Sequence, residues 1–140
     1  MIKRKIFYSV VQENNIVRPR KQDGYEIAVD GIKFNAYKSM IDGRVYILDP
    51  KNGIAVFTFS DDTDTDALPH HELVEKAKDE FIKRGVFERW KEQCDKESYQ
   101  LTNKMFNAYK KAESLREQQR ELVQKEIEEG RRQQDDEKEV

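Results

Sequence analysis

The feature that most constrains this chain is a long segment, residues 86–129, that contains neither proline nor glycine. Its residues are mostly strong helix formers such as Glu, Lys, Gln and Leu, which favour one continuous α-helix. At about 1.5 Å per residue such a helix is roughly 65 Å long. Gly130 marks its expected end, and we expect residues 131–140 to form a disordered acidic tail. The segment therefore predicts an extended helix rather than a second compact domain.

Apolar or small residues recur at every seventh position of this segment, which is typical of coiled coils. They are Phe87, Cys94, Leu101, Ala108, Leu115 and Leu122. The second line, four residues later, is apolar only at Met105 and Ala112, so we expect at most a weak homodimer through this helix. Aromatic residues beside these lines widen the apolar surface. The predicted partner-binding residues of the helix are Leu101, Met105, Phe106, Tyr109 and Leu115.

The first 60 residues predict an antiparallel β-meander, because short β-rich runs are separated by turn-forming pairs. The clearest pair is Asp30-Gly31, which suits a two-residue hairpin turn between residues 25–29 and 32–36. This turn sets Val29 opposite Ile32 and Ile27 opposite Phe34. Further strands are expected at residues 5–12, 44–48 and 54–59, with a polar loop at 17–24.

Residues 69–84 predict an amphipathic helix that covers the sheet, since Leu73, Val74, Ala77, Phe81 and Ile82 fall on one helical face. The expected fold class is therefore α+β: a meander of about five strands packed by one helix (residues 1–85), followed by the long C-terminal helix (86–130) and the tail (131–140).

The composition limits the class of protein. Charged residues make up 39% of the chain and apolar residues 36%, so part of the chain is expected to lie outside a compact core. One cysteine excludes an internal disulfide framework and fits a reducing compartment. No apolar run approaches the roughly 20 residues that span a bilayer. We expect a cytoplasmic protein without a membrane segment.

The segment of residues 60–72, SDDTDTDALPHHE, raises the question of a metal site. An EF-hand loop that starts at Asp62 has Ala67 in place of the required glycine and Leu73 in place of the final glutamate. His70 and His71 are adjacent, whereas chelating histidines on a helix stand three or four residues apart. We therefore predict no metal ligand and no cofactor. The acidic residues of this segment are instead predicted to contact a basic partner surface: Asp61, Asp62, Asp64 and Asp66.

No pattern of a catalytic site is evident. Cys94 lies in the predicted helix without a glycine-rich turn beside it, and no phosphate-binding glycine loop is present. We therefore expect a protein that is not an enzyme. A metal-dependent enzyme at residues 61–75 is the third alternative.

The most basic spot is the predicted loop with Arg18, Arg20 and Lys21, which suits nucleic-acid phosphates. Against this, the whole chain has an isoelectric point of about 5.8. A nucleic-acid-binding accessory protein is therefore the second hypothesis rather than the first.

Residues 44–85, with YILDPKNGIAVF, an acidic link and HELVEKAKDEFIKRG, resemble small accessory modules encoded by phages and conjugative elements. The resemblance implies a host-targeting or anti-defence protein, such as an anti-CRISPR-like inhibitor, that acts by occupying a partner's surface. The leading hypothesis is therefore a non-enzymatic protein-binding module, with a host effector or a second copy of the chain as its partner.

Overall fold

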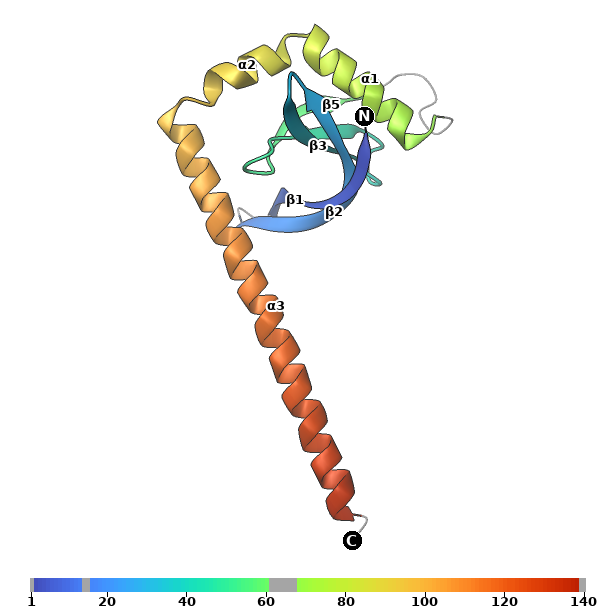
Figure 1. Ribbon diagram of the computed structural model, residues 1–140, viewed down its shortest axis with the longest axis vertical. Helices are drawn as coiled ribbons and strands as arrows, with labels where there is room; N and C mark the ends of the chain where they lie inside the picture. The colour runs from blue at the N-terminus through green and yellow to red at the C-terminus, as the bar shows by residue number, and fades with distance from the viewer. Residues whose placement is uncertain (1, 14–15, 61–67, 139–140) are drawn as a thin grey trace. The chain divides into compact units, whose positions relative to one another are not determined.

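The computed structural model describes residues 2–13, 16–60 and 68–138, which form five strands followed by three helices (Figure 1). The elements are β1 (Lys3–Glu13), β2 (Ile16–Val29), β3 (Ile32–Lys38), β4 (Val45–Leu48), β5 (Ala55–Phe59), α1 (His70–Lys83), α2 (Val86–Gln93) and α3 (Glu97–Lys138). The strands form one antiparallel sheet in sequence order. The predicted α+β fold is therefore confirmed. The chain divides into two units, Met1–Asn107 and Ala108–Val140.

The hairpin of β2 and β3 has the register that its turn predicts. Val29 is opposite Ile32 and Ile27 is opposite Phe34. Asp30 and Gly31 have φ angles of 52° and 79°, as a type I′ turn requires. Because side chains alternate across a strand, this register brings Ile27, Val29 and Phe34 to the buried face.

Residues 17–24, which were predicted to be a loop, belong to β2, so that prediction is wrong. Their strand pairs with β1 from Lys3 to Glu13, whereas β3 pairs only with Tyr25–Val29. Pro19 is tolerated because this part of β2 has a partner strand on one side only. Gly24 is needed at a close approach, since a Cβ there would lie 2.3 Å from the carbonyl oxygen of Ala36.

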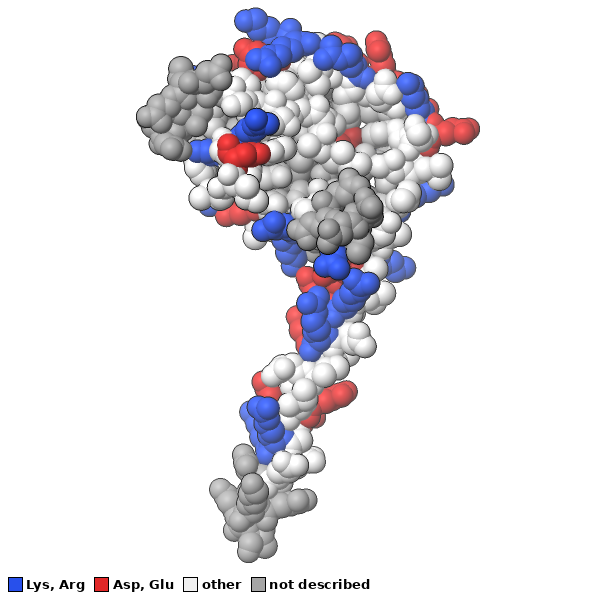
Figure 2. Space-filling model, turned by 180° about the vertical axis from the view of Figure 1, so that it is seen from behind, with Lys and Arg blue, Asp and Glu red and all other residues white. Residues whose placement is uncertain are grey.

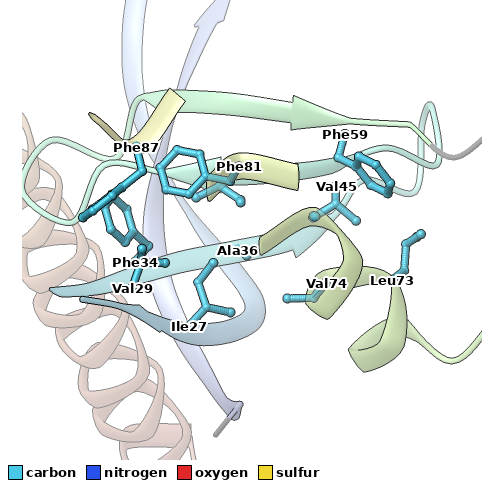
Figure 3. Packing of buried hydrophobic residues seen from close by; sticks show 12 residues of the cluster. Ile27, Val29, Phe34, Ala36, Val45, Phe59, Leu73, Val74, Phe81 and Phe87 are labelled. Carbon is cyan, nitrogen blue, oxygen red and sulfur yellow. The ribbon is translucent and has the colours of Figure 1, made fainter. Parts of the chain in front are cut away.

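The core lies between the sheet and helices α1 and α2 (Figure 3). Phe34 is fully buried, and its ring makes edge contacts with Phe81 and Trp90 at centroid distances of 5.3 and 4.8 Å. From α1, Leu73, Val74, Ala77 and Phe81 are buried, as their spacing predicts. Ile82 is 45% exposed, so it lies at the edge of the packed face and not in it.

The long helix is interrupted, which the sequence did not predict. α2 ends at Gln93 and α3 begins at Glu97, and the backbone N–H of Lys96 donates to the carbonyl of Gln93 in the turn between them. No proline or glycine marks this break, because it is the packing of Phe87 and Trp90 that sets the direction of α2. At the other end, α3 continues through Gly130 to Lys138 and not into a tail that starts at residue 131.

Candidate functional site

The strongest candidate for a binding surface is an apolar stripe on α3 in the second unit. We call it the arm stripe; it consists of Tyr109, Ala112, Leu115, Leu122, Val123 and Ile127. Leu115 and Leu122 are 56% and 60% exposed, and Val123 and Ile127 are 46% and 44% exposed. These residues share one face at about 3.6 residues per turn. A helix with a large exposed apolar face is unusual unless another chain covers it.

The predicted partner-binding residues of α3 divide into two groups. Leu101 and Met105, in the first unit, are 60% and 55% exposed, while Tyr109 and Leu115, in the second unit, are 38% and 56% exposed. Phe106 is only 6% exposed, so in this structure its side chain lies inside the first unit and not on the exposed part of this face. Its ring lies where a side chain at Gly53 would be, 2.9 Å from the position of a Cβ there. Phe106 therefore packs on the turn between β4 and β5.

That turn holds a buried carboxylate, Asp49, which is 2% exposed. Its Oδ1 accepts hydrogen bonds from the backbone N–H groups of Lys51 (2.7 Å) and Asn52 (3.1 Å). Its Oδ2 accepts from Nε1 of Trp90 on α2 (2.7 Å) and from the hydroxyl of Tyr99 on α3 (2.8 Å). One oxygen therefore closes the turn, and the other fixes two helices to it. We call Asp49, Trp90 and Tyr99 the aspartate clamp.

A second contact between the turn and α3 lies beside the aspartate clamp. Nδ2 of Asn52 donates to Oδ1 of Asn103 at 3.0 Å, and both side chains are buried. Oδ1 of Asn52 accepts from the backbone N–H of Ile54 at 3.0 Å. Buried polar groups are costly unless they are paired, so these bonds favour a single position for the start of α3.

The clamp changes the chemistry of Tyr99. Burial, and then the hydrogen bond to the Asp49 carboxylate, raise the pKa of Tyr99 far above its ordinary value near 10. A neutral phenol is the form that donates to a carboxylate. This role was not predicted from the sequence, because Trp90 and Tyr99 stand out there only as aromatic residues beside the heptad line.

The basic residues predicted for nucleic-acid binding lie on β2 and do not form one cluster. Arg18, Arg20 and Lys21 are exposed, but side chains alternate along a strand. Arg18 and Arg20 therefore share one face of the β1–β2 ribbon, and Lys21 is on the other. There, Nζ of Lys21 lies 6.0 Å from the ring centroid of Tyr8.

Arg20 contributes to a groove of about 630 Å³ that also has Tyr37, Tyr46, Met40 and Asp42 in its lining. The two tyrosine rings are stacked at a centroid distance of 5.4 Å. The hydroxyl of Tyr46 donates to Asp42, which lowers the pKa of that carboxyl. Met40 is 89% exposed at the rim. The groove combines a cation, stacked rings and exposed apolar surface.

The acidic residues predicted to contact a partner, Asp61, Asp62, Asp64 and Asp66, lie outside the described residues. Within the parts of the chain that are described, no group of three or more His, Cys, Asp or Glu side chains is placed to hold a metal ion. Cys94 is half-buried, and its thiol donates to the carbonyl oxygen of Trp90 at 3.3 Å. Burial raises the pKa of this thiol, which opposes formation of the nucleophilic thiolate.

Comparisons of the chain with protein-family models, with curated proteins and with solved structures find no match. Among the helices of residues 68–138, none combines the length and the apolar character needed to cross a membrane.

Proposed function

We propose that this protein is a non-enzymatic protein-binding module that binds a helix of a partner protein through the arm stripe. The observation that carries the proposal is the exposure of Leu115, Leu122, Val123 and Ile127 on one face of α3. Moving such a side chain from full exposure to full burial contributes about 1.5–3 kcal/mol. Because these four are about half exposed, covering them contributes about half of that each, which is enough to drive association of two helices when several are covered together.

The first unit supports this proposal by holding the beginning of α3. The aspartate clamp and the Asn52–Asn103 hydrogen bond fix Tyr99 and Asn103 to the β4–β5 turn. A helix whose first turns are already ordered loses less conformational entropy when it binds. The clamp is therefore suited to presenting a helix and has no evident catalytic use.

The proposal extends to the inhibitor role implied by the resemblance of residues 44–85 to phage and mobile-element accessory modules. An inhibitor of a host nucleic-acid-processing or defence complex needs only to occupy a surface of that complex. A binding helix suffices for that purpose, and no reaction has to be catalysed.

The test compares protein capture from a bacterial lysate by three forms of the chain. The stripe variant is Leu115→Glu with Leu122→Glu. The matched control, Ser114→Glu with Gln124→Glu, adds the same two charges on the opposite face of the helix. We expect a captured protein to be retained by the wild type and the control and lost from the stripe variant. Equal capture by all three forms, in lysate with and without nuclease, would contradict the proposal.

A second candidate is nucleic-acid binding at the groove, favoured by the position of Arg20 beside the stacked rings of Tyr37 and Tyr46. Aromatic faces stack on bases, and an arginine attracts the phosphates. If the groove binds single-stranded DNA, Arg20→Ala weakens the binding of a fluorescent oligonucleotide, and Lys21→Ala, on the other face, has a much smaller effect. Equal effects of the two changes would place any such binding outside the groove.

A further inference from the structure

Most of the charges that border the arm stripe are positive. Lys111 and Lys125 lie along one border with Glu129, and Arg116 and Arg120 lie along the other with Glu113. The acidic residues Glu117, Glu121 and Glu128 are on the opposite face of the helix. Figure 2 shows uncharged surface along this helix beside groups of Lys and Arg, with groups of Asp and Glu among them.

We infer that the partner of the arm stripe is an amphipathic helix of another protein with acidic residues along both of its borders. This inference rests on the proposed function and specifies the chemistry of its partner. Residues at the borders of paired helices contact each other and decide which helices pair. A partner with Glu or Asp at these positions would place a carboxylate opposite each cation.

A second copy of the chain fits this surface poorly. In a parallel pair of arms, Lys111 of one copy would approach Arg116 of the other, and in an antiparallel pair the Lys111–Lys125 border would face itself. Like charges in such positions are unfavourable. Gln119 and Glu126 also interrupt the apolar line that a self-paired helix would bury. The charges beside the stripe therefore oppose the pairing of two copies of the chain and favour a partner with acidic borders.

Glu113 is an acidic residue beside the stripe that pairs with two of these cations. It lies 3.9 Å from Arg116 and 3.2 Å from Arg120. Both pairs are within the same helix, and both arginine side chains are more than two-thirds exposed. Exposed pairs of this kind contribute little, so a partner carboxylate can replace Glu113 at small cost.

The test uses the full chain and two synthetic four-heptad peptides with leucine at both core positions. One peptide has glutamate along both borders, and the other has lysine there. Binding is measured by fluorescence anisotropy at low and at physiological salt. We expect the acidic peptide to bind at least about tenfold more tightly than the basic one, with a preference that decreases as salt rises.

A charge-reversed variant, Lys111→Glu with Lys125→Glu, should bind the acidic peptide about tenfold more weakly and bind the basic peptide more tightly. The matched control, Lys110→Glu with Ser114→Glu and Gln124→Glu, makes the same change of net charge on the opposite face of the helix and should leave both affinities within about twofold. Circular dichroism checks that both variants keep their helix content.

The outcomes separate this inference from the proposed function. Equal binding of the two peptides would overturn the inference, whereas the stripe would still be a helix-binding surface. Binding of neither peptide would overturn the inference and the proposed function together. A stable dimer of the chain in light scattering that the acidic peptide does not dissociate would overturn the inference in favour of a second copy.

Discussion

At the scale of single residues, Asp49 connects a local turn with two helices that lie far along the chain. It is a carboxylate within a turn whose sequence, Asp-Pro-Lys-Asn-Gly, already predicts a turn. What the turn pattern does not predict is the second oxygen, which accepts from Trp90 and Tyr99, 41 and 50 residues further along the chain. A residue that closes a local turn thereby also places two helices.

We predict that Asp49→Asn lowers the free energy of unfolding by about 2–4 kcal/mol. An amide has one acceptor oxygen, so either the two turn N–H groups or the two helix donors lose their acceptor. Urea unfolding followed by the fluorescence of Trp90, the single tryptophan, measures the change. Asp79→Asn, at an exposed position of α1, is the control and should change stability by less than about 0.5 kcal/mol. Equal stability of the two variants would show that the clamp contributes nothing.

The raised pKa of Tyr99 predicts a dependence of stability on alkaline pH. Its folded-state pKa lies above the unfolded value near 10, so its contribution is fully present below about pH 10 and is lost as the pH rises further. Above about pH 10 the free energy of unfolding of the wild type should fall by about 1.4 kcal/mol per pH unit more than that of Tyr99→Phe. Urea unfolding of both forms between pH 8 and about pH 11 tests this. Parallel curves would exclude the effect, since the other tyrosines are common to both proteins.

At the scale of elements, sequence patterns correctly predicted the features that depend only on neighbouring residues of the chain. The hairpin at Asp30-Gly31 fixed its own register, and the stripe of Leu73 to Phe81 fixed the buried face of α1. The first part of β2, predicted as a loop at residues 17–24, and the break after Gln93 were missed, because both depend on contacts with distant residues. Strand pairing with β1 extended a segment that its proline and glycine mark as a loop.

For the candidate site, too, the sequence predicted the features that depend on the helix itself and missed one that depends on a distant residue. The exposure of Leu101, Met105 and Leu115 followed from the heptad pattern, because nothing in the described structure covers these positions fully. The burial of Phe106 did not follow, since it depends on the absence of a side chain at Gly53, in another element. A helix pattern shows which residues share a face, but not which part of that face the rest of the chain already covers.

The contact between Gly53 and Phe106 gives a prediction for the β4–β5 turn. Gly53 has a φ angle of 68°, and an added Cβ would lie 2.9 Å from both the Phe106 ring and the Tyr8 carbonyl oxygen. We expect Gly53→Ala to lower the free energy of unfolding by about 2–4 kcal/mol, from backbone strain and overpacking together.

Gly43→Ala is the matched control for this change. Gly43 has a φ angle of 70°, but a Cβ there would meet nothing within 4 Å. Its cost is therefore backbone strain alone, about 1 kcal/mol. The difference between the two variants in thermal or urea unfolding measures the packing of Phe106 on the turn. Equal costs would mean that Phe106 moves aside without loss.

At the scale of the whole molecule, the chain contains two units with different kinds of stability. The core, the aspartate clamp and the packing of Phe106 all lie within Met1–Asn107. The described residues of the unit Ala108–Val140 belong to α3, and the side chains of residues 108–134 are mostly exposed. The stability of this unit therefore comes from helix propensity and from intrahelical pairs such as Glu113–Arg120. A protein of this kind is expected to fold without the second unit and to bind through it.

Two truncations test this division. A chain ending at Asn107 keeps Tyr99, Asn103 and Phe106, so we expect it to unfold cooperatively with a free energy of unfolding within about 1 kcal/mol of the full chain. A chain ending at Lys96 lacks all three, and we expect it to lose at least about 4 kcal/mol, since a buried phenylalanine alone accounts for about 3–5 kcal/mol. Urea unfolding followed by Trp90 fluorescence measures both, because both chains keep that residue. If the shorter chain were as stable as the longer one, α3 would not be part of the folded unit. If the longer chain failed to fold, the second unit would be needed for stability, and its exposed stripe would have a structural role rather than a role in binding.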